Sequence, residues 1–145
     1  MNLKEELKTI LKGEVEDAEE VLQTYSRDAS LFELKPRAVV FPKDAEDVKA
    51  LVRFVKEHKE ENLSLTCRSG GSDMTGGPLT QSIAVDMQRH FNSILEFGEK
   101  TVRVQPGVWY RDFEKETVKR NLLLTCYHAS KDLCTLVCML ANYAG

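Results

Sequence analysis

A glycine-rich stretch at residues 68–78, called the glycine loop below, constrains this chain more than any other feature. It reads RSGGSDMTGGP and holds four of the eight glycines of the chain. Neighbouring glycines let the backbone take positive φ angles and approach a ligand closely. Consecutive N–H groups that point into one concavity form a nest for phosphate or pyrophosphate. Because Gly, Ser, Asp and Pro are also ordinary turn residues, the stretch predicts either a phosphate-binding loop or a plain surface loop.

Strand-like segments flank the glycine loop on both sides. Residues 63–67 alternate apolar and polar side chains, and residues 83–87 read IAVDM. Earlier in the chain, the short apolar run 38–41 precedes a segment, residues 48–55, in which apolar side chains recur at helical spacing. Asp44 stands where it can cap that helix. The order strand, helix, strand predicts a βαβ opening whose second strand leads into the glycine loop.

The position of the glycines argues against a Rossmann unit, which would carry them between the first strand and the helix. Residues 42–45 at that junction read PKDA and contain no glycine. A phosphate would therefore have to be bound by the loop between strands. In such a loop the backbone N–H groups are the main donors, the hydroxyls of Ser69, Ser72 and Thr75 add further donors, and Arg68 adds a cationic edge.

The other segments complete an α+β pattern. Two amphipathic helices are predicted in an N-terminal extension, residues 1–34, and are expected to pack on the outside of the domain. A β-hairpin is predicted over residues 93–105, followed by a helix in which Trp109 and Phe113 are expected to be core residues. The apolar run at residues 122–124 predicts a buried strand or the approach to one.

Composition excludes several classes of protein. Twenty Lys and Arg residues against 23 Asp and Glu residues give a net charge of −3. Because the sequence shows no basic face, nucleic acid is not expected as a partner. No apolar run approaches the roughly 18 residues of a membrane-spanning helix, and the N-terminus has no signal-peptide core, which favours a cytoplasmic protein. The four cysteines are too few and too irregular for a disulfide framework and lack the further ligands of a metal site, so reduced thiols are expected.

Seven segments, taken in order, resemble the FAD-binding domain of FAD-linked oxidases of the p-cresol methylhydroxylase and vanillyl-alcohol oxidase type. The glycine loop resembles the pyrophosphate-binding loop of that family, and residues 83–87 resemble the strand after it. The other resembling segments are residues 36–42, 44–51, 102–108, 129–135 and 139–142. The resemblance implies this α+β fold over residues 35–145, truncated in its second subdomain, in the version carried by D-lactate and glycolate dehydrogenases.

The resemblance also implies a cofactor, FAD, and the residues that would contact it. Some members of the family carry a histidine at the position of Ser72 that bonds covalently to the flavin; a serine cannot, so the FAD is expected to be non-covalent. The parent enzyme would transfer hydride from a small 2-hydroxy acid to FAD, with its catalytic groups downstream of this chain. The cofactor-binding residues expected here are Arg68, Ser69, Gly70, Gly71, Ser72, Asp73, Thr75 and Gly76 in the loop, with Ser130 and Thr135 near the flavin.

The chain departs from the family pattern near its end. Val137 and Cys138 stand where two glycines usually leave room for the flavin, and Val137 is β-branched, which disfavours a positive φ. Asn142 is followed by Tyr143 instead of a second asparagine. His128 replaces a proline and is expected to be an exposed substitution and not a catalytic base.

Three functions stay open at this point. The first is the FAD-binding portion of a 2-hydroxy-acid dehydrogenase, which would make the purified protein yellow. The second is an inactive truncated remnant or an interaction module without flavin, which would be colourless. The third keeps the fold but changes the substrate, as in the reductase that makes UDP-N-acetylmuramate; residues 131–135 and the long N-terminal extension fit that enzyme less well.

Overall fold

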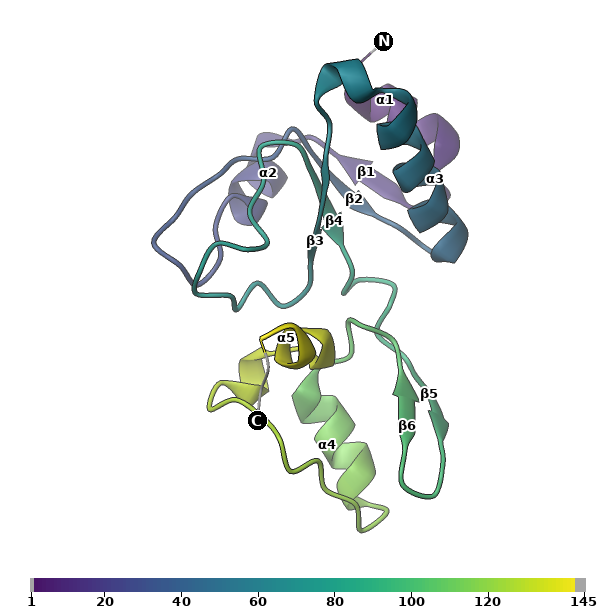
Figure 1. Ribbon diagram of the computed structural model, residues 1–145, viewed down its shortest axis with the longest axis vertical. Helices are drawn as coiled ribbons and strands as arrows, with labels where there is room; N and C mark the ends of the chain where they lie inside the picture. Colours follow the sequence, from purple (N-terminus) through teal and green to yellow (C-terminus); the bar gives the residue numbers. More distant parts are fainter. Residues whose placement is uncertain (1, 143–145) are drawn as a thin grey trace.

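The structure, a computed structural model, describes residues 2–142 of the chain. Figure 1 shows two units: a sheet unit (residues 2–86) and a hairpin unit (residues 94–142), joined by the segment that follows β4. The strands are β1 (Glu14–Glu16), β2 (Ala38–Phe41), β3 (Leu65–Arg68), β4 (Ile83–Asp86), β5 (Ile94–Phe97) and β6 (Val102–Val104). The helices are α1 (Leu3–Ile10), α2 (Glu19–Tyr25), α3 (Ala45–Glu57), α4 (Tyr110–Val118) and α5 (Leu136–Ala141), with short 3-10 turns η1 (Lys59–Glu61) and η2 (Lys131–Leu133).

The sheet unit is built on four strands in the order β1-β2-β4-β3. β2 and β3 both run parallel to β4, with Ala38 and Leu65 opposite Ile83, whereas β1 pairs antiparallel with β2. The predicted βαβ opening is therefore confirmed as β2-α3-β3, with β4 inserted between its two strands. Since β2, β3 and β4 are parallel, their carboxyl ends meet at one edge of the sheet, which is where ligands bind in open α/β sheets.

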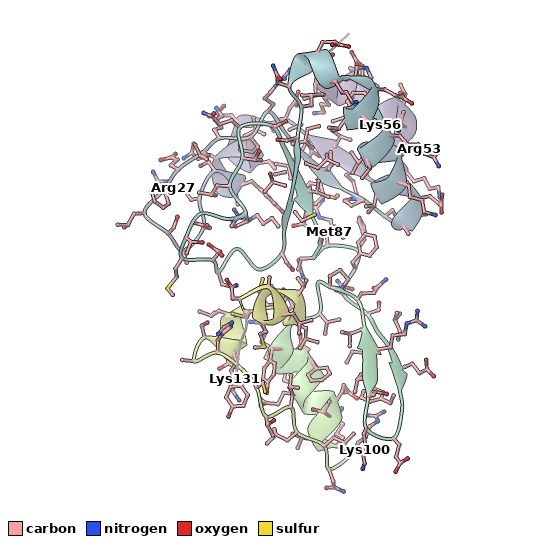
Figure 2. All side chains as sticks on the ribbon, viewed as in Figure 1. Arg27, Arg53, Lys56, Met87, Lys100 and Lys131 are labelled. Atoms are coloured by element: carbon pink, nitrogen blue, oxygen red, sulfur yellow. The ribbon has the colours of Figure 1, made fainter. Side chains whose placement is uncertain are left out.

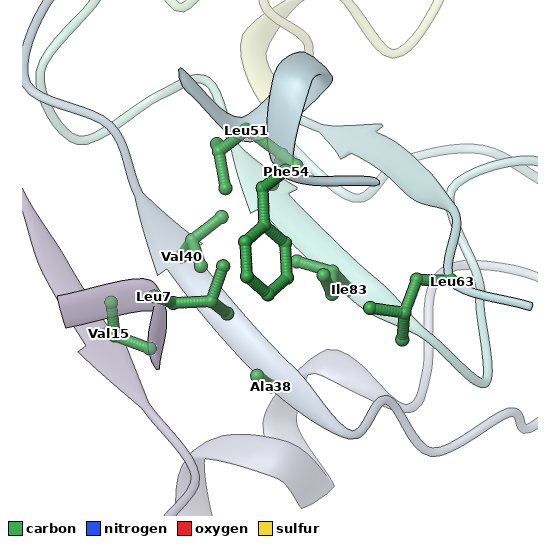
Figure 3. Packing of buried hydrophobic residues seen from close by; sticks show 9 residues of the cluster. Leu7, Val15, Ala38, Val40, Leu51, Phe54, Leu63 and Ile83 are labelled. Atoms are coloured by element: carbon green, nitrogen blue, oxygen red, sulfur yellow. The ribbon is translucent and has the colours of Figure 1, made fainter. Parts of the chain in front are cut away.

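Both faces of the sheet are covered. On one face α1 and α3 pack on the strands, and Figure 3 shows Leu7, Leu51 and Phe54 directed toward Val40 and Ile83. On the other face α2 packs on the neighbouring side chains of β2 and β4. All four residues of β4 are buried, as expected for a central parallel strand with a helix layer on each side.

The sequence had predicted a purely helical N-terminal extension, and this prediction is wrong. Between its two helices lies β1, whose Val15 faces Val40 of β2 in the register and is 3% exposed. The second of the two predicted helices, α2, begins at Glu19, after this strand. A three-residue Glu-Val-Glu strand is too short to show a period of two, which is why the sequence alone did not predict it. The boundary between residues 34 and 35 stays a prediction.

A buried carboxylate fastens this extension to the start of α3. Asp44 caps the helix as predicted, accepting from the N–H groups of Glu46 and Asp47. Asp47 itself is 1% exposed and accepts from the N–H groups of Lys12 (3.0 Å), Gly13 (2.9 Å) and Lys43 (2.9 Å). The carboxylate thus satisfies three backbone donors from two distant segments.

The hairpin unit follows the predicted order only in part. The hairpin β5-β6 is confirmed, with an antiparallel register and a bulge between Ile94 and Glu96. Phe113 of α4 is buried beside Tyr110 and Met139. The strand expected at residues 122–124 is wrong: these residues form no strand, and Leu123 is 60% exposed. No helix within residues 2–142 is long and apolar enough to cross a membrane.

Replacing Asp47 with alanine is expected to lower the free energy of unfolding by about 2–4 kcal/mol, because it leaves three backbone donors without an acceptor in a buried place. Urea unfolding followed by circular dichroism measures the change. The matched control is Asp112→Ala, an exposed carboxylate paired with Lys115, which is expected to stay within about 0.5 kcal/mol of the parent. A loss at Asp47 no larger than the control's would contradict the role given to this side chain.

Candidate functional site

A cavity of about 400 Å³ lies between the carboxyl edge of the sheet and α5. Figure 1 shows α5 facing the loop that follows β3, and Figure 2 shows Met87, another lining residue, at the junction of the two units. The glycine loop supplies one wall, including Ser69, Gly71 and Ser72. The predicted loop and the C-terminal segment therefore do meet at one place, at the edge where a ligand is expected.

The backbone of the glycine loop is left free to bind. The last sheet bond on this side runs from the N–H of Met87 to the carbonyl of Arg68 at 2.8 Å. Beyond it, no group within residues 2–142 accepts a hydrogen bond from the N–H groups of residues 69–73. Gly71 takes φ = +64°, a conformation that glycine adopts without a steric penalty. Five consecutive donors without a protein acceptor are what an anion nest requires.

Ser69 carries the clearest sign of a missing partner. Its Oγ is buried and has no hydrogen-bond partner within residues 2–142. A buried hydroxyl without a partner costs about 1–3 kcal/mol, so such groups are rare in folded proteins. The hydroxyl belongs to a residue that lines the cavity. The hydroxyl is therefore a donor that the described residues leave unused at the edge of the cavity.

Arg68 lines the cavity, and one nitrogen of its guanidinium is tied to the other side of the sheet unit. Its Nη1 donates to the carbonyl oxygens of Arg27 at 2.6 Å and Tyr25 at 3.3 Å, and its guanidinium lies 5.1 Å from the centre of the Tyr25 ring. A Cβ at Gly71 would lie 2.6 Å from Arg68 Nη2. Nη1 is thus directed to the end of α2, while the rest of the guanidinium lies against Gly71 and lines the cavity. Its contact with a cofactor stays a prediction.

Asp73 and Thr75 shape the loop from within. Oδ1 of Asp73 accepts three hydrogen bonds: from the N–H of Thr75 at 2.6 Å, from the hydroxyl of Thr75 at 2.7 Å and from the N–H of Gly77 at 3.2 Å. The Thr75 hydroxyl, followed by these backbone donors, holds the pKa of Asp73 below its ordinary value. Neither Thr75 nor Gly76 lines the cavity; Gly76 takes φ = +83° beside the ring of Phe32. Thr75 and Gly76 therefore stabilise the conformation of the turn and do not form the cavity wall.

Ser130 and Thr135, the two predicted residues outside the loop, do not line the cavity either. Ser130 Oγ lies 3.3 Å from Cys134 Sγ, and Thr135 is fully buried with its hydroxyl donating to Cys138 Sγ at 3.2 Å. The wall opposite the loop comes from Val137, Cys138 and Ala141 of α5 and from Asn142, which caps that helix. None of these four was among the predicted cofactor-binding residues, although the resemblance had placed Val137 and Cys138 near the flavin.

Val137 does not adopt a positive φ angle. Val137 lies within α5, and among residues 2–142 the only non-glycine residues with positive φ are Asn62 and Asn121. His128 is half-buried and not exposed as expected, with its Nε2 buried and unpartnered within the described residues. Val137, which replaces a glycine of the family pattern, lines the cavity. This departure therefore changes the shape of the cavity wall.

Trp109 lies against the glycine loop. A Cβ at Gly70 would lie 3.2 Å from Cζ3 of the Trp109 ring, so glycine is what allows this close approach. The guanidinium of Arg111 lies 4.7 Å from the centre of the same ring. The tryptophan is half-buried and part of the contact between the two units, while Phe113 is the core residue that was predicted.

An open sheet whose carboxyl edge carries loop amides without protein acceptors is the arrangement in which α/β proteins bind phosphate-bearing ligands. The FAD-binding domain family matches residues 36–145, and the chain belongs to that family. Solved structures with this fold include alkyldihydroxyacetonephosphate synthase (TM-score 0.79, 24% identity, 94% of this chain and 28% of that one). Another is p-cresol methylhydroxylase (TM-score 0.72, 20% identity, 90% of this chain and 27% of that one). The predicted fold and cofactor class are confirmed.

Curated relatives carry the name D-2-hydroxyglutarate dehydrogenase. The protein from Escherichia coli K12 is 42% identical over 87 residues, which is 59% of this chain and 8% of that protein. The protein from Stutzerimonas stutzeri A1501 is 34% identical over 109 residues, 72% of this chain and 23% of the relative. The chain thus spans less than a quarter of the length of these relatives. Their name points to a 2-hydroxy acid, as predicted, but not to D-lactate or glycolate.

The carboxylate of Asp73 is expected to hold the turn in a pH-dependent way. Because its pKa is lowered in the folded chain, its contribution is complete above the ordinary carboxyl pKa of about 4 and is lost as the pH falls through the lowered value. The amide chemical shifts of Thr75 and Gly77, followed by NMR against pH, should move together below pH 4. Asp73→Asn should abolish that transition, and a midpoint above 4 in the parent would contradict the assignment.

Proposed function

We propose that this chain binds FAD non-covalently at the glycine loop, as the FAD-binding portion of a dehydrogenase that acts on a 2-hydroxy acid. The observation that carries the proposal is the buried hydroxyl of Ser69, which has no partner within residues 2–142 and sits beside five free backbone donors. Family membership supports the identity of the cofactor. Because the glycine loop lies within this chain, we expect the chain itself to bind the diphosphate of FAD.

The residues present fit such a cofactor. The N–H groups of residues 69–73 and the hydroxyls of Ser69 and Ser72 would bind the diphosphate, because charge-assisted hydrogen bonds are the strong ones. Val137 and Met87 give the same cavity an apolar side, which suits a flavin ring better than a free phosphate. Bound FAD supplies a hydride acceptor, and the residues of this chain bind and orient it. We expect the FAD to be non-covalent because serine stands at position 72, where some members of the family carry the histidine that bonds to the flavin.

The substrate belongs to the whole protein and is proposed on the relatives' name. D-2-hydroxyglutarate is the 2-hydroxy acid that this name supports, and it replaces D-lactate and glycolate as the substrate we expect. The flavin of the full-length gene product should be reduced at least tenfold faster by D-2-hydroxyglutarate than by D-lactate or glycolate. Anaerobic stopped-flow absorbance at the flavin band measures this, and equal rates would contradict the substrate assignment.

Ser69→Ala gives the sharpest test of cofactor binding by this chain. The variant is expected to weaken FAD binding about tenfold, the usual effect of losing one hydrogen bond to a charged group. Without FAD, the same variant should unfold no more easily than the parent, because the removed hydroxyl has no partner to lose. Flavin fluorescence titration and urea unfolding measure the two effects. Ser93→Ala, which changes an exposed serine just before β5, should change neither.

The outcomes separate the alternatives. Loss of FAD affinity with unchanged stability supports the proposed site. A parent chain that stays colourless and does not bind FAD at millimolar concentration would contradict it and favour the inactive remnant or the interaction module. A Ser69→Ala variant that is destabilised as much as it loses affinity would assign the hydroxyl to the fold and not to a ligand.

A further inference from the structure

A buried thiol connects the glycine loop to the hairpin unit. Sγ of Cys134 lies 3.3 Å from the hydroxyl of Ser72 and 3.3 Å from the hydroxyl of Ser130. Cys134 is 3% exposed, and its carbonyl accepts from the N–H of Tyr110 at 3.0 Å, so the thiol is fixed in place. Ser72 lines the cavity, whereas Ser130 and Cys134 do not. The cluster therefore reaches the site only through Ser72.

When the thiol donates to one of the two hydroxyls, the hydrogens of this cluster can be arranged in two ways. A thiol and a hydroxyl each have one hydrogen to donate. If the thiol donates to Ser130, the hydroxyl of Ser72 must donate to sulfur and keeps no hydrogen for a ligand. If the thiol donates to Ser72, Ser130 donates to sulfur, and the hydroxyl hydrogen of Ser72 is free for the cavity. An anion in the cavity favours the second arrangement, because it turns the last bond into a charge-assisted one.

We propose that Cys134 and Ser130 are positioning residues that aim the hydroxyl of Ser72 at a phosphate oxygen of the bound nucleotide. The donors run in one direction, from the Ser130 hydroxyl to the Cys134 sulfur, from the Cys134 thiol to the Ser72 oxygen, and from the Ser72 hydroxyl to the ligand. This inference rests on the proposed function for the identity of the ligand. It gives Ser130 an effect on the site although that residue does not line the cavity.

The test is a double-mutant cycle between Ser72 and Cys134, with FAD affinity measured by flavin fluorescence. Ser72→Ala and Cys134→Ala should each weaken binding about three- to tenfold, and the double variant should be no weaker than Ser72→Ala alone, because the thiol acts only through that hydroxyl. Ser130→Ala should weaken binding by a smaller factor in the same range. Cys134→Ser, which restores a donor and an acceptor, should stay within about twofold of the parent.

Controls separate positioning from folding. Cys126→Ala changes an exposed thiol whose only recorded hydrogen-bond contact among the described residues is with Thr125, and it should leave FAD affinity unchanged. Thermal unfolding followed by circular dichroism should show that each variant still folds. If the losses at Ser72 and Cys134 add, or if Cys134→Ala equals Cys126→Ala, the inference is overturned while the proposed function stands.

A second readout decides the inference without FAD. In the flavin-free chain, NMR coupling constants of the Ser72 side chain should report one χ1 rotamer in the parent and in Cys134→Ser, and mixed rotamers in Cys134→Ala. Inorganic pyrophosphate should then shift the Ser72 resonances of the parent more than those of Cys134→Ala. If the parent does not bind FAD but these differences appear, the proposed function fails and the positioning role is supported. Unchanged rotamers in Cys134→Ala overturn the role in either case.

Discussion

The parallel pairing of β3 with β4 is the constraint on which the site depends. Leu65 lies opposite Ile83 and Arg68 opposite Asp86, so residues 69–82 must carry the chain from the carboxyl end of β3 back to the amino end of β4. Parallel strands need such a crossover of about a dozen residues, usually a helix. Here the glycine loop begins the crossover, which fixes it at the carboxyl edge and leaves its amides outside any ladder or helix.

The free loop is held in shape from both sides. The end of α2 holds Arg68, and Arg68 lies beneath Gly71. On the other side the ring of Trp109 approaches Gly70 and the thiol of Cys134 reaches Ser72. These contacts organise the loop without using its amides. The unpaired hydroxyl of Ser69 fits the same pattern, since a group left unsatisfied by the fold is available to a ligand.

Local patterns predicted those parts of the fold that depend on neighbouring residues. Helical spacing predicted α3, the Asp44 cap was correct, and alternation predicted β3 and the hairpin. Contacts between distant segments could not be predicted in this way. Asp47 had the sequence signature of a first-turn acid, but it binds amides of residues 12 and 13. The apolar run 122–124 has the composition of a strand yet pairs with no strand among the described residues.

By itself the sequence determined the chemistry of the candidate site: where glycine permits a positive φ, which side chains carry hydroxyls, and that a serine stands at position 72 in place of a flavin-bonding histidine. These are properties of single residues and of neighbours in the chain. Only the tertiary structure decided which donors remain for a ligand. The hydroxyl of Thr75 is used within the turn, Arg68 donates to α2, and Ser69 stays unpaired. The physical reason is that each donor's acceptor is set by which segments the fold brings within hydrogen-bond distance of it.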